Sequence, residues 1–398
     1  MKYDVIVIGG GASGLLASIE AKKHFNKVAI IEKEQRLGRK ILATGNGKCN
    51  MTNTNAQMKN YRGSFSFAVK ELFREYSPEF IINYFKSLGL CSFADSCGRV
   101  YPKCKQASAV LDILRNKVQM MDIEEKLGYC VKGIEISDGF TVTTDNGKFS
   151  CDKLIIATGG KSSPKLGSDG SMFKIITENI GHTVTKLRPA LCPINVKSDI
   201  IKSLKGVRAD GVVSVLKKGK VVKSEVGEIQ FTENSISGIC AFNLSGLDYD
   251  KVRISLMAES DKSEIESVLY ERRKLFKDNR IEDFFLGMFN NKLSVALLKA
   301  EKMGSFNRRC CDISNKEIEK LAYLINHFEF ETTGNNDYGK SQVTRGGVIA
   351  SEINSTTMES LFIPNLYFCG EVIDIDGECG GYNLQFAFAS GIKAGQLL

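Results

Sequence analysis

The sequence predicts an α/β protein with a Rossmann-like main domain, a β-rich second domain and a small helical insert. Three observations support this fold class. Within the first 32 residues, a β-branched run is followed by glycines, a helical pattern and a second apolar run, as in a βαβ unit. Farther on, alternating segments separated by Gly, Asn and Asp indicate hairpins. Two helix-start signals then precede apolar residues at helical spacing.

The main domain contains the elements of a parallel sheet. We expect strands at Asp4–Ile8 and Val28–Glu32, joined by a helix over Leu15–Phe25. Continuous β-branched runs are typical of strands that are buried on both faces. From Tyr129 to Asp152 the alternation and the turn residues predict a β-meander. The apolar run Leu154–Ala157 then continues the sheet.

The middle of the chain differs from the main domain. Short strands such as Val212–Leu216 and Val221–Val226 predict a β-rich domain between Pro189 and Leu256. Asp261–Glu264 and Ser314–Glu317 each place a capping residue three positions before a glutamate, the capping-box pattern of a helix start. A helical insert therefore follows the β-rich domain.

Composition excludes several classes of protein. The chain has 398 residues, 43% of them hydrophobic, and a net charge of +8 from 54 Lys and Arg against 46 Asp and Glu. This balance is typical of a globular chain rather than a disordered one. No run approaches the roughly 18 apolar residues of a membrane span. The amino terminus leads directly into a strand-like run without signal-peptide features, so we expect a cytoplasmic protein with no membrane partner.

Cysteines and charges give little sign of metal or nucleic acid. The twelve cysteines have irregular spacing without C-x-x-C, and His24, His182 and His327 are far apart. We therefore expect reduced thiols and no metal site. The basic runs, such as Lys217–Lys223, are read as solvated faces, so we expect no nucleic-acid partner.

The glycines after the first strand form a dinucleotide motif. Gly9-Gly10-Gly11-Ala12-Ser13-Gly14 is a G-x-G-x-x-G between a strand and a helix. Gly9 permits a tight turn, Gly11 lets a diphosphate approach the helix end, and Gly14 allows close packing of helix on strand. Glu32, at the end of the second strand, suits the ribose hydroxyls and would repel a 2′-phosphate.

Two later segments favour FAD over NAD as the bound dinucleotide. Ala157-Thr158-Gly159-Gly160 follows the meander, and Phe368-Cys369-Gly370-Glu371 follows the late apolar strand Leu366–Cys369. At these places, two-dinucleotide-binding flavoproteins bring a later strand back to the flavin. The fold class is therefore a Rossmann-like two-dinucleotide-binding flavoprotein FAD domain. We find no second G-x-G-x-x-G, so NAD(P)H would act only as a transient donor.

Two long motifs resemble a known family. They run from Gly38 to Asn53 (GRKILATGNGKCNMTN) and from Leu366 to Gln385, and shorter matches lie between them. The chain thereby resembles the BaiN-like (YhiN-like) family of FAD-dependent oxidoreductases along its whole length. The resemblance implies an FAD domain in two pieces, 1–190 and 345–398. It also implies a β-barrel-like domain at 191–257 and 329–344 and a helical insert domain at 258–328.

The resemblance also implies roles for particular residues. Glu371 would bind a ribityl hydroxyl, and Val131 would lie near the adenine. Gly380 and Gly381 precede a last helix whose amino end would face the flavin, while residues 39–46 would form a loop that closes over the cofactor. The residues that we expect to bind FAD are Gly9, Gly11, Ala12, Ser13, Gly14, Glu32, Lys33, Arg39, Lys40, Asn46, Gly47, Val131, Thr158, Gly159, Gly160, Gly370, Glu371, Gly380, Gly381, Tyr382 and Asn383.

Catalytic candidates are fewer. Tyr382 can donate a proton beside the flavin, and Arg345 can orient a carbonyl or carboxylate, although a tyrosine between glycines often has a structural role and a loop arginine is often solvated. The chain departs from the family pattern at Glu233, where relatives have histidine, and at Ile239, where they have proline. No role is carried over to Glu233.

The resemblance implies an enzyme in which FAD exchanges a hydride with a small-molecule substrate. One reaction is reduction of an enone double bond of a steroid or bile-acid-like compound, with NAD(P)H as donor. A second is oxidation of an amine of the aminoacetone type by dioxygen. The positive charge motivates a third hypothesis, a flavoprotein that modifies or binds RNA.

Overall fold

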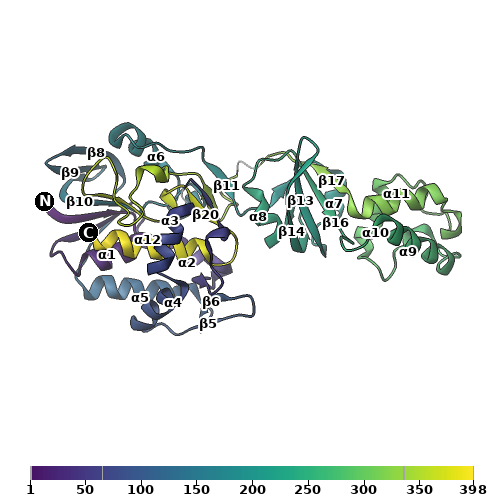
Figure 1. Cartoon of the computed structure of the whole chain (residues 1–398), viewed down its shortest axis with the longest axis horizontal. Coiled ribbons are helices and arrows are strands. Elements are labelled where there is room, and N and C mark those ends of the chain that lie inside the picture. The colour runs from purple at the N-terminus through teal and green to yellow at the C-terminus, as the bar shows by residue number, and fades with distance from the viewer. Residues whose placement is uncertain (1, 65, 335–336, 398) are drawn as a thin grey trace. The chain divides into compact units, whose positions relative to one another are not determined.

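The computed structural model of the chain describes residues 2–64, 66–334 and 337–397 (Figure 1). It divides into two compact units, Met1–Pro189 with Asp337–Leu398, and Ala190–Asn336. Each has its own hydrophobic core.

The first unit is built on a seven-stranded sheet. Its strands are β1 (Lys2–Ile8), β2 (Val28–Glu32), β7 (Glu124–Leu127), β8 (Val131–Ser137), β9 (Gly139–Thr144), β10 (Gly147–Ile156) and β19 (Leu366–Phe368). The order is β7-β2-β1-β10-β9-β8, with β19 also paired to β10. Pairs β7–β2, β2–β1, β1–β10 and β10–β19 are parallel. This is the predicted Rossmann-type arrangement.

Strand β10 joins the meander to the parallel sheet. Its first half pairs with β9, from Gly147↔Thr144 to Cys151↔Phe140. Its second half pairs with β19, from Leu154↔Leu366 to Ile156↔Phe368. The carboxyl end of β19 therefore lies beside that of β10, more than two hundred residues earlier in the chain. This pairing brings the late Gly370 motif to the same sheet edge as the first glycine motif.

Helices cover the sheet, and α12 packs closely on α1 (Figure 1). A Cβ on Gly391 would lie 2.4 Å from the Ser13 carbonyl oxygen, and one on Gly395 would lie 2.4 Å from that of Ala17. Small residues thus allow the two backbones to approach. The helices of this unit are α1 (Ala12–Ala21), α2 (Arg39–Ala43), α3 (Ser66–Glu75), α4 (Pro78–Ser87), α5 (Ala107–Met120), α6 (Ser171–Ile175) and α12 (Tyr382–Gln396).

Short strands complete the first unit. Strand β4 (Tyr61–Gly63) pairs with β20 (Ile375–Gly377), and β6 (Arg99–Pro102) pairs with β3 (Thr52–Asn53) and β5 (Ser92–Ala94). The two remaining strands are β11 (Arg188–Ala190) and β18 (Val343–Arg345). Helices α3 to α5 and strands β3 to β6 are additions that our sequence analysis did not predict. The predicted helix Leu15–Phe25 is displaced: α1 begins directly after Gly11 and ends at Ala21.

The second unit contains a barrel-like sheet. The strand order is β12-β15-β14-β13-β16-β17. An isolated bridge between Val196 and Thr332 joins the two edges, with Lys197 N–H donating to the Glu331 carbonyl at 3.1 Å. The strands are β12 (Ile194–Asn195), β13 (Arg208–Lys217), β14 (Lys220–Phe231), β15 (Ser235–Ser237), β16 (Lys251–Ser255) and β17 (Phe328–Glu331). The prediction of a β-rich second region is confirmed, and its β-barrel-like character stays a prediction.

The described helices of the second unit are α7 (Asp199–Ser203), α8 (Ile239–Ser245), α9 (Lys262–Leu275), α10 (Asn291–Ala300) and α11 (Asn315–Asn326). Of these, α9 and α11 begin at the predicted start signals, whereas α7, α8 and α10 were not predicted. Asp261 caps α9 and Ser314 caps α11, each in a capping box. The strands and these helices share one hydrophobic core, so the separate barrel and insert domains, with their boundaries, remain a prediction.

Candidate functional site

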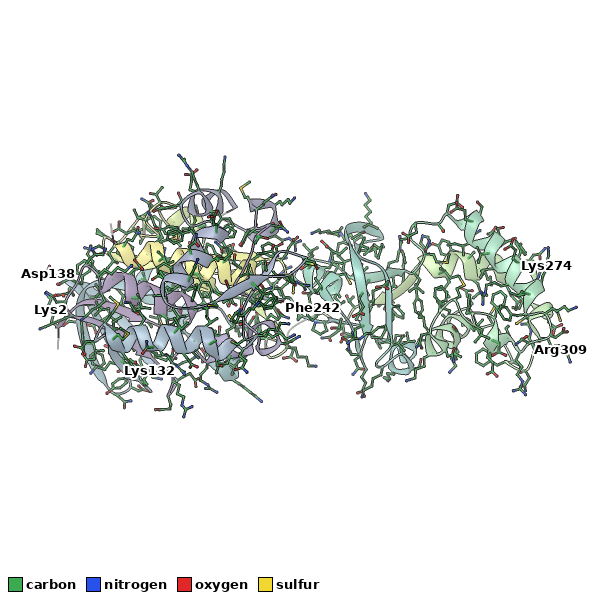
Figure 2. All side chains as sticks on the ribbon, turned by 90° about the horizontal axis from the view of Figure 1, so that it is seen from below. Lys2, Lys132, Asp138, Phe242, Lys274 and Arg309 are labelled. Carbon is green, nitrogen blue, oxygen red and sulfur yellow. The ribbon has the colours of Figure 1, made fainter. Side chains whose placement is uncertain are left out.

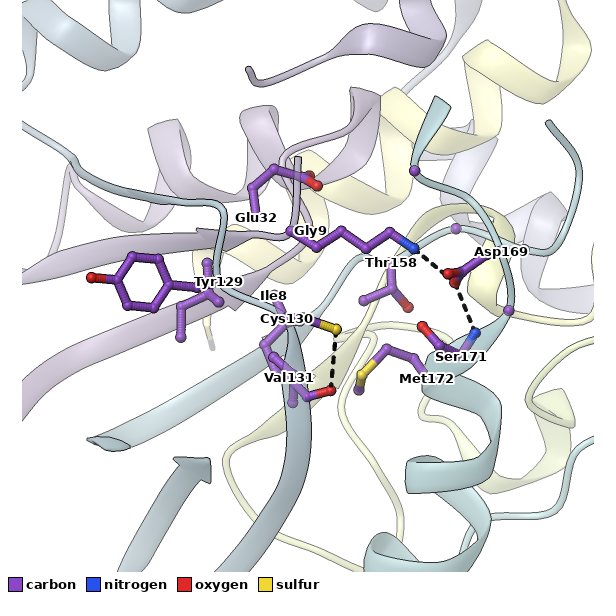
Figure 3. Close-up of a pocket in the computed structure, with 16 residues that line it drawn as sticks. Ile8, Gly9, Glu32, Tyr129, Cys130, Val131, Thr158, Asp169, Ser171 and Met172 are labelled. Atoms are coloured by element: carbon purple, nitrogen blue, oxygen red, sulfur yellow. Dashed lines mark hydrogen bonds and ion pairs between the residues drawn. The ribbon is translucent and has the colours of Figure 1, made fainter. Parts of the chain in front are cut away.

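A pocket lies at the carboxyl ends of β1, β2 and β10 (Figure 3). The space that these residues surround is about 490 Å³, and this figure includes open solvent. Seven predicted cofactor residues line it: Gly9, Glu32, Lys33, Val131, Thr158, Gly159 and Gly160. The other lining residues are Ile8, Ile31, Tyr129, Cys130, Gly167, Asp169, Gly170, Ser171 and Met172.

Each of the three motif positions favours glycine for a different physical reason. A Cβ on Gly14 would lie 1.9 Å from the Gly9 carbonyl oxygen, so only glycine lets α1 approach the turn. Gly9 has φ +99°, and its Cβ would lie 2.6 Å from the Ala157 carbonyl oxygen. A Cβ on Gly11 would meet nothing within 4 Å. Gly11 therefore faces open space at the positive end of α1, where the N–H groups of the first helical turn suit a diphosphate.

Glu32 is held in place beside this turn. Its Oε2 accepts a hydrogen bond from Gly10 N–H at 2.8 Å, and its Oε1 accepts one from Glu34 N–H at 2.9 Å. Burial raises the pKa of the Glu32 carboxyl, which opposes its ionisation. Each oxygen keeps a lone pair, so the carboxylate can still accept from ribose hydroxyls. The residues present therefore fit the adenosine diphosphate part of FAD.

An ion pair spans one wall of the pocket. Lys33 Nζ lies 2.7 Å from Asp169 Oδ1, which also accepts from Ser171 N–H at 3.0 Å (Figure 3). Burial opposes the ionisation of Asp169, but the hydrogen bonds from Lys33 and Ser171 outweigh it and lower the pKa of that carboxyl. The pair ties the turn before α6 to the end of β2.

Glu371 and Lys40 form a second ion pair, close to the pocket residue Gly160. Lys40 Nζ lies 2.7 Å from Glu371 Oε2, and Thr344 N–H donates to Glu371 Oε1 at 2.7 Å. Arg39 pairs with Glu34. Both carboxylate oxygens of Glu371 thus have protein partners, and its role toward a ribityl hydroxyl stays a prediction.

The predicted loop over residues 39–46 needs correction. Arg39 and Lys40 lie in the short helix α2, which begins after Gly38, and only residues 44–47 form a tight 3₁₀ turn. Asn46 and Gly47 of this turn are exposed. Ion pairs made by Arg39 and Lys40 hold α2 against the rest of the unit, which explains why these residues are helical rather than open loop.

The end of the chain contributes a second glycine turn. Gly381 has φ +101°, and its Cβ would lie 2.5 Å from the Thr52 carbonyl oxygen. Helix α12 starts at the next residue. Asn383 uses both ends of its amide on Gly377, accepting from its N–H at 2.8 Å and donating to its carbonyl at 2.9 Å. This predicted FAD residue therefore shapes the turn.

The two ends of the chain meet at the late glycine motif. Ser13 Oγ donates to the Cys369 carbonyl oxygen at 3.4 Å, and a Cβ on Gly370 would lie 2.4 Å from Ser13 Oγ. The structure thus brings Ser13 of the first motif to Gly370.

Tyr382 is a protonated phenol at neutral pH. Burial, with smaller contributions from Glu378 and Cys379, raises the pKa of Tyr382. Its ring makes an edge contact with the ring of Tyr61, with centroids 6.0 Å apart. Tyr61 OH donates to the Tyr382 carbonyl oxygen at 2.9 Å. The tyrosine is thus positioned by its neighbours and keeps its proton available.

Arg345 is not the solvated loop arginine that the sequence suggested as its ordinary role. It ends strand β18 and donates to both oxygens of Asp376, from Nε at 2.9 Å and from a terminal nitrogen at 2.6 Å. Asp376 is only 3% exposed. Burial opposes the charge of Arg345, but the hydrogen bonds and attraction from Asp376 raise the pKa of the guanidinium. This geometry supports a positioning role.

Thiols and His182 fit structural roles. The twelve cysteines are all free. Burial raises the pKa of both Cys49 and Cys369 to about 12, so neither is an activated thiolate. His182 is buried between Glu352 (3.0 Å) and Ser360 (2.8 Å).

Some buried side chains that were not predicted as site residues carry a polar atom without a hydrogen-bond partner. In the part of the chain that the structure describes, three buried side-chain atoms have no hydrogen-bond partner: Asn50 Oδ1, Thr143 Oγ1 and Ser168 Oγ. Ser168 Oγ lies 3.2 Å from where a Cβ of the pocket residue Gly159 would be. The Gly167–Gly170 motif was the sequence signal for this wall. Ser168 Oγ is therefore a buried atom beside a predicted cofactor residue that a bound group could satisfy.

Within the described ranges, 2–64, 66–334 and 337–397, no helix is long and apolar enough to cross a membrane. The same residues contain no group of three or more His, Cys, Asp and Glu side chains that could hold a metal ion.

Fold and site together define a Rossmann-type dinucleotide-binding protein of the flavoprotein class. Residues 3–397 match the family described as HI0933-like protein Rossmann domain, and the chain belongs to this family. It is 33% identical to the 3-dehydro-bile acid delta(4,6)-reductase of Clostridium scindens, over 98% of this chain and 97% of that one. The predicted BaiN-like membership is confirmed, and the protein is an FAD-dependent oxidoreductase.

Other relatives are named for an activity that differs from bile acid reduction. The chain is 28% identical to the ribosomal RNA dihydrouridine synthase of Escherichia coli, over 98% of this chain and 96% of the relative. Among solved structures, it resembles a 3-ketosteroid delta1-dehydrogenase from Sterolibacterium denitrificans with a TM-score of 0.52 and 12% identity, over 99% of both chains. The structural likeness shows the shared fold.

Proposed function

We propose that this protein reduces a carbon–carbon double bond conjugated with a ketone, on a steroid or bile-acid-like compound. The observation that carries the proposal is the 33% identity, over 98% of the chain, to a 3-dehydro-bile acid delta(4,6)-reductase. That name describes a 3-oxo compound with double bonds at positions 4 and 6, which is a conjugated enone. Reduction of such a bond adds a hydride to the β-carbon and a proton to the α-carbon.

The chain's own residues have distinct tasks in this reaction. FAD, when bound, supplies the hydride from its reduced ring. The Gly9–Gly14 turn and the amino end of α1 bind the diphosphate, and Glu32 binds the adenosine ribose. Tyr382 holds the proton on its phenol, because burial raises its pKa, and delivers it to the α-carbon. Arg345, which is held by its hydrogen bonds to Asp376, orients a carbonyl or carboxylate of the substrate.

A second candidate is reduction of uridine in ribosomal RNA. The identities of 28% and 27% to two ribosomal RNA dihydrouridine synthases, each over at least 97% of this chain, favour it. The chemistry is related, since the uracil 5,6 double bond is also conjugated with a carbonyl. These relatives weaken the expectation that nucleic acid is not a partner. Lys274 and Arg309 of the second unit point outward (Figure 2), and the charge that motivates RNA binding is the +8 of the whole chain.

The decisive experiment mixes anaerobically reduced, FAD-loaded protein with a 3-oxo-4-ene bile acid. We expect the oxidised flavin spectrum to return and the product mass to increase by two hydrogens. The matched control is the saturated 3-oxo bile acid, which has the same skeleton without the double bond. Absence of reoxidation by the unsaturated compound contradicts the proposal.

The RNA candidate is tested on the same reduced protein. Ribosomal RNA transcripts whose uridines are all unmodified would reoxidise the flavin and gain dihydrouridine. Control RNA that contains no uridine would do neither. Binding of RNA should then weaken steeply with salt. Reoxidation by RNA alone would replace the steroid proposal by this one.

NAD(P)H is the proposed hydride donor to the flavin. Anaerobic titration of the oxidised protein with NADH and with NADPH tests it, and bleaching of the flavin absorbance by either is the expected result. If both fail while dithionite bleaches the flavin, another donor is used.

A further inference from the structure

Asn50 carries a buried oxygen that has no hydrogen-bond partner. Its Oδ1 is one of the three such atoms in the described part of the chain. A buried polar atom without a partner is costly, because it has lost its hydrogen bonds to water and gained none in the protein. Such an atom is therefore explained best by a ligand that supplies the missing donor.

The surroundings of Asn50 place this oxygen at the start of α12. A Cβ built on Gly381, the capping residue of α12, would lie 2.7 Å from Asn50 Oδ1. Close by, Asn53 donates from Nδ2 to the Gly380 carbonyl oxygen at 3.0 Å. The Gly38–Asn53 motif and the last glycine turn are therefore in contact, although more than three hundred residues separate them.

The backbone holds Asn50 firmly. Cys49, directly before it, is buried and has φ +55°. Met51 N–H, directly after it, donates to the Val100 carbonyl oxygen at 2.8 Å. A Cβ on Gly45 would lie 2.9 Å from Asn50 N, so the preceding turn packs tightly on it. The side-chain oxygen is thus preorganised.

The chemistry of a flavin edge explains why an acceptor is needed here. The pyrimidine edge of the isoalloxazine has two carbonyl oxygens, which accept hydrogen bonds, and between them N3–H, which donates one. The first turn of a helix offers N–H donors only. It can serve the carbonyls but not N3–H. A side-chain oxygen beside the helix start supplies the acceptor that the helix lacks.

We propose that Asn50 Oδ1 accepts a hydrogen bond from N3–H of the flavin and so anchors the ring at the start of α12. The inference rests on FAD being the cofactor. It assigns a function to the Lys48-Cys49-Asn50 part of the motif, to which no cofactor role was assigned from the sequence. N3–H is present in both oxidised and reduced flavin, so Asn50 contributes to binding in both states.

The test compares FAD with N3-methyl-FAD, in which the N3 proton is replaced. Apo-protein is titrated with each by flavin fluorescence, for wild type and for Asn50→Ala. We expect Asn50→Ala to weaken FAD binding by roughly tenfold, the loss of one buried hydrogen bond. Methylation should weaken binding to the wild type by a similar factor and have much less effect in the variant. Equal methylation penalties in both proteins contradict the proposal.

Two further variants keep the test decisive. Asn55→Ala, in the same segment but with an exposed side chain, should bind FAD as the wild type does. Asn50→Asp keeps an acceptor oxygen, so FAD binding should persist, while the added negative charge lowers the midpoint potential of the flavin. An unchanged potential overturns the proposal even if Asn50→Ala does not fold. Failure of the wild type to bind FAD would instead contradict the cofactor assignment.

Discussion

The candidate site of the first unit and the capped start of α11 in the second unit use polar contacts of different range. In the second unit, Ser314 caps α11 and Glu317 bonds to Ser314 and Arg308, all within nine residues. In the first unit, Lys40 pairs with Glu371 across 331 positions, and Ser13 reaches Cys369 across 356. The candidate site is thus assembled from distant pieces, whereas the starts of α9 and α11 are fixed locally by their capping boxes. A sequence can therefore predict where helices begin without predicting which distant residues come together at the site.

The largest expected effect comes from Gly14. Gly14→Ala places a methyl group 1.9 Å from the Gly9 carbonyl oxygen, so α1 must move away from β1. We expect a loss of about 3 kcal/mol in the free energy of unfolding and no measurable FAD binding. Denaturant unfolding of the apo-protein and FAD titration measure the two effects.

Gly11 sharpens this contrast because it serves the ligand and not the packing. A methyl group at Gly11 meets nothing within 4 Å. Gly11→Ala should therefore leave the unfolding free energy of the apo-protein within about 0.5 kcal/mol of the wild type while weakening FAD by more than tenfold. A destabilised apo-protein with intact FAD affinity would reverse our assignment of the two glycines.

The second glycine turn should be nearly as sensitive. Gly381→Ala combines φ +101° with a methyl group 2.5 Å from the Thr52 carbonyl oxygen, so we expect a loss of about 2 kcal/mol in stability and weaker FAD binding. Gly89→Ala is the control, because Gly89 has φ +99° with nothing within 4 Å. It should cost about 1 kcal/mol and leave FAD affinity unchanged.

Acid should act on the second unit through Glu317. The hydrogen bonds from Arg308, which outweigh burial, lower the pKa of Glu317 to about 2. A lowered carboxyl pKa contributes stability that is present above the unfolded value, 4.5, and is lost as pH falls toward 2. Glu317→Gln should remove about 1 kcal/mol at pH 7 and flatten the pH dependence between 5 and 2. Chemical denaturation across that range checks it, and an unchanged slope would show that Glu317 adds nothing.

The smallest effect is expected at the pocket wall. Lys33→Ala breaks the ion pair with Asp169 and frees the turn before α6, so FAD should dissociate about two- to threefold faster. Salt should speed release from the wild type and not from the variant. Lys2→Ala removes a comparable pair, with Asp152 at 2.8 Å, outside the set of residues that line the pocket, and should change neither rate nor salt dependence.

Several parts of this protein were predictable because their signals are local. The β-branched runs gave β1 and β2, since continuous burial demands apolar residues at every position. The capping boxes at Asp261 and Ser314 gave the starts of α9 and α11. The glycine spacing of residues 9–14 predicted the tight turn before α1, because a close approach of helix and strand admits no side chain.

What the sequence alone did not determine depends on contacts between distant segments. Helix α2 appeared as a loop because its ion pairs with Glu34 and Glu371 could not be seen in the motif. Arg345 is held by its hydrogen bonds to Asp376, although a loop arginine is often solvated. Asn50 became a candidate only when folding buried its oxygen beside Gly381 and left it without a donor. Local patterning fixes elements, whereas burial and partnership, which decide what a polar group can bind, exist only once the chain has folded.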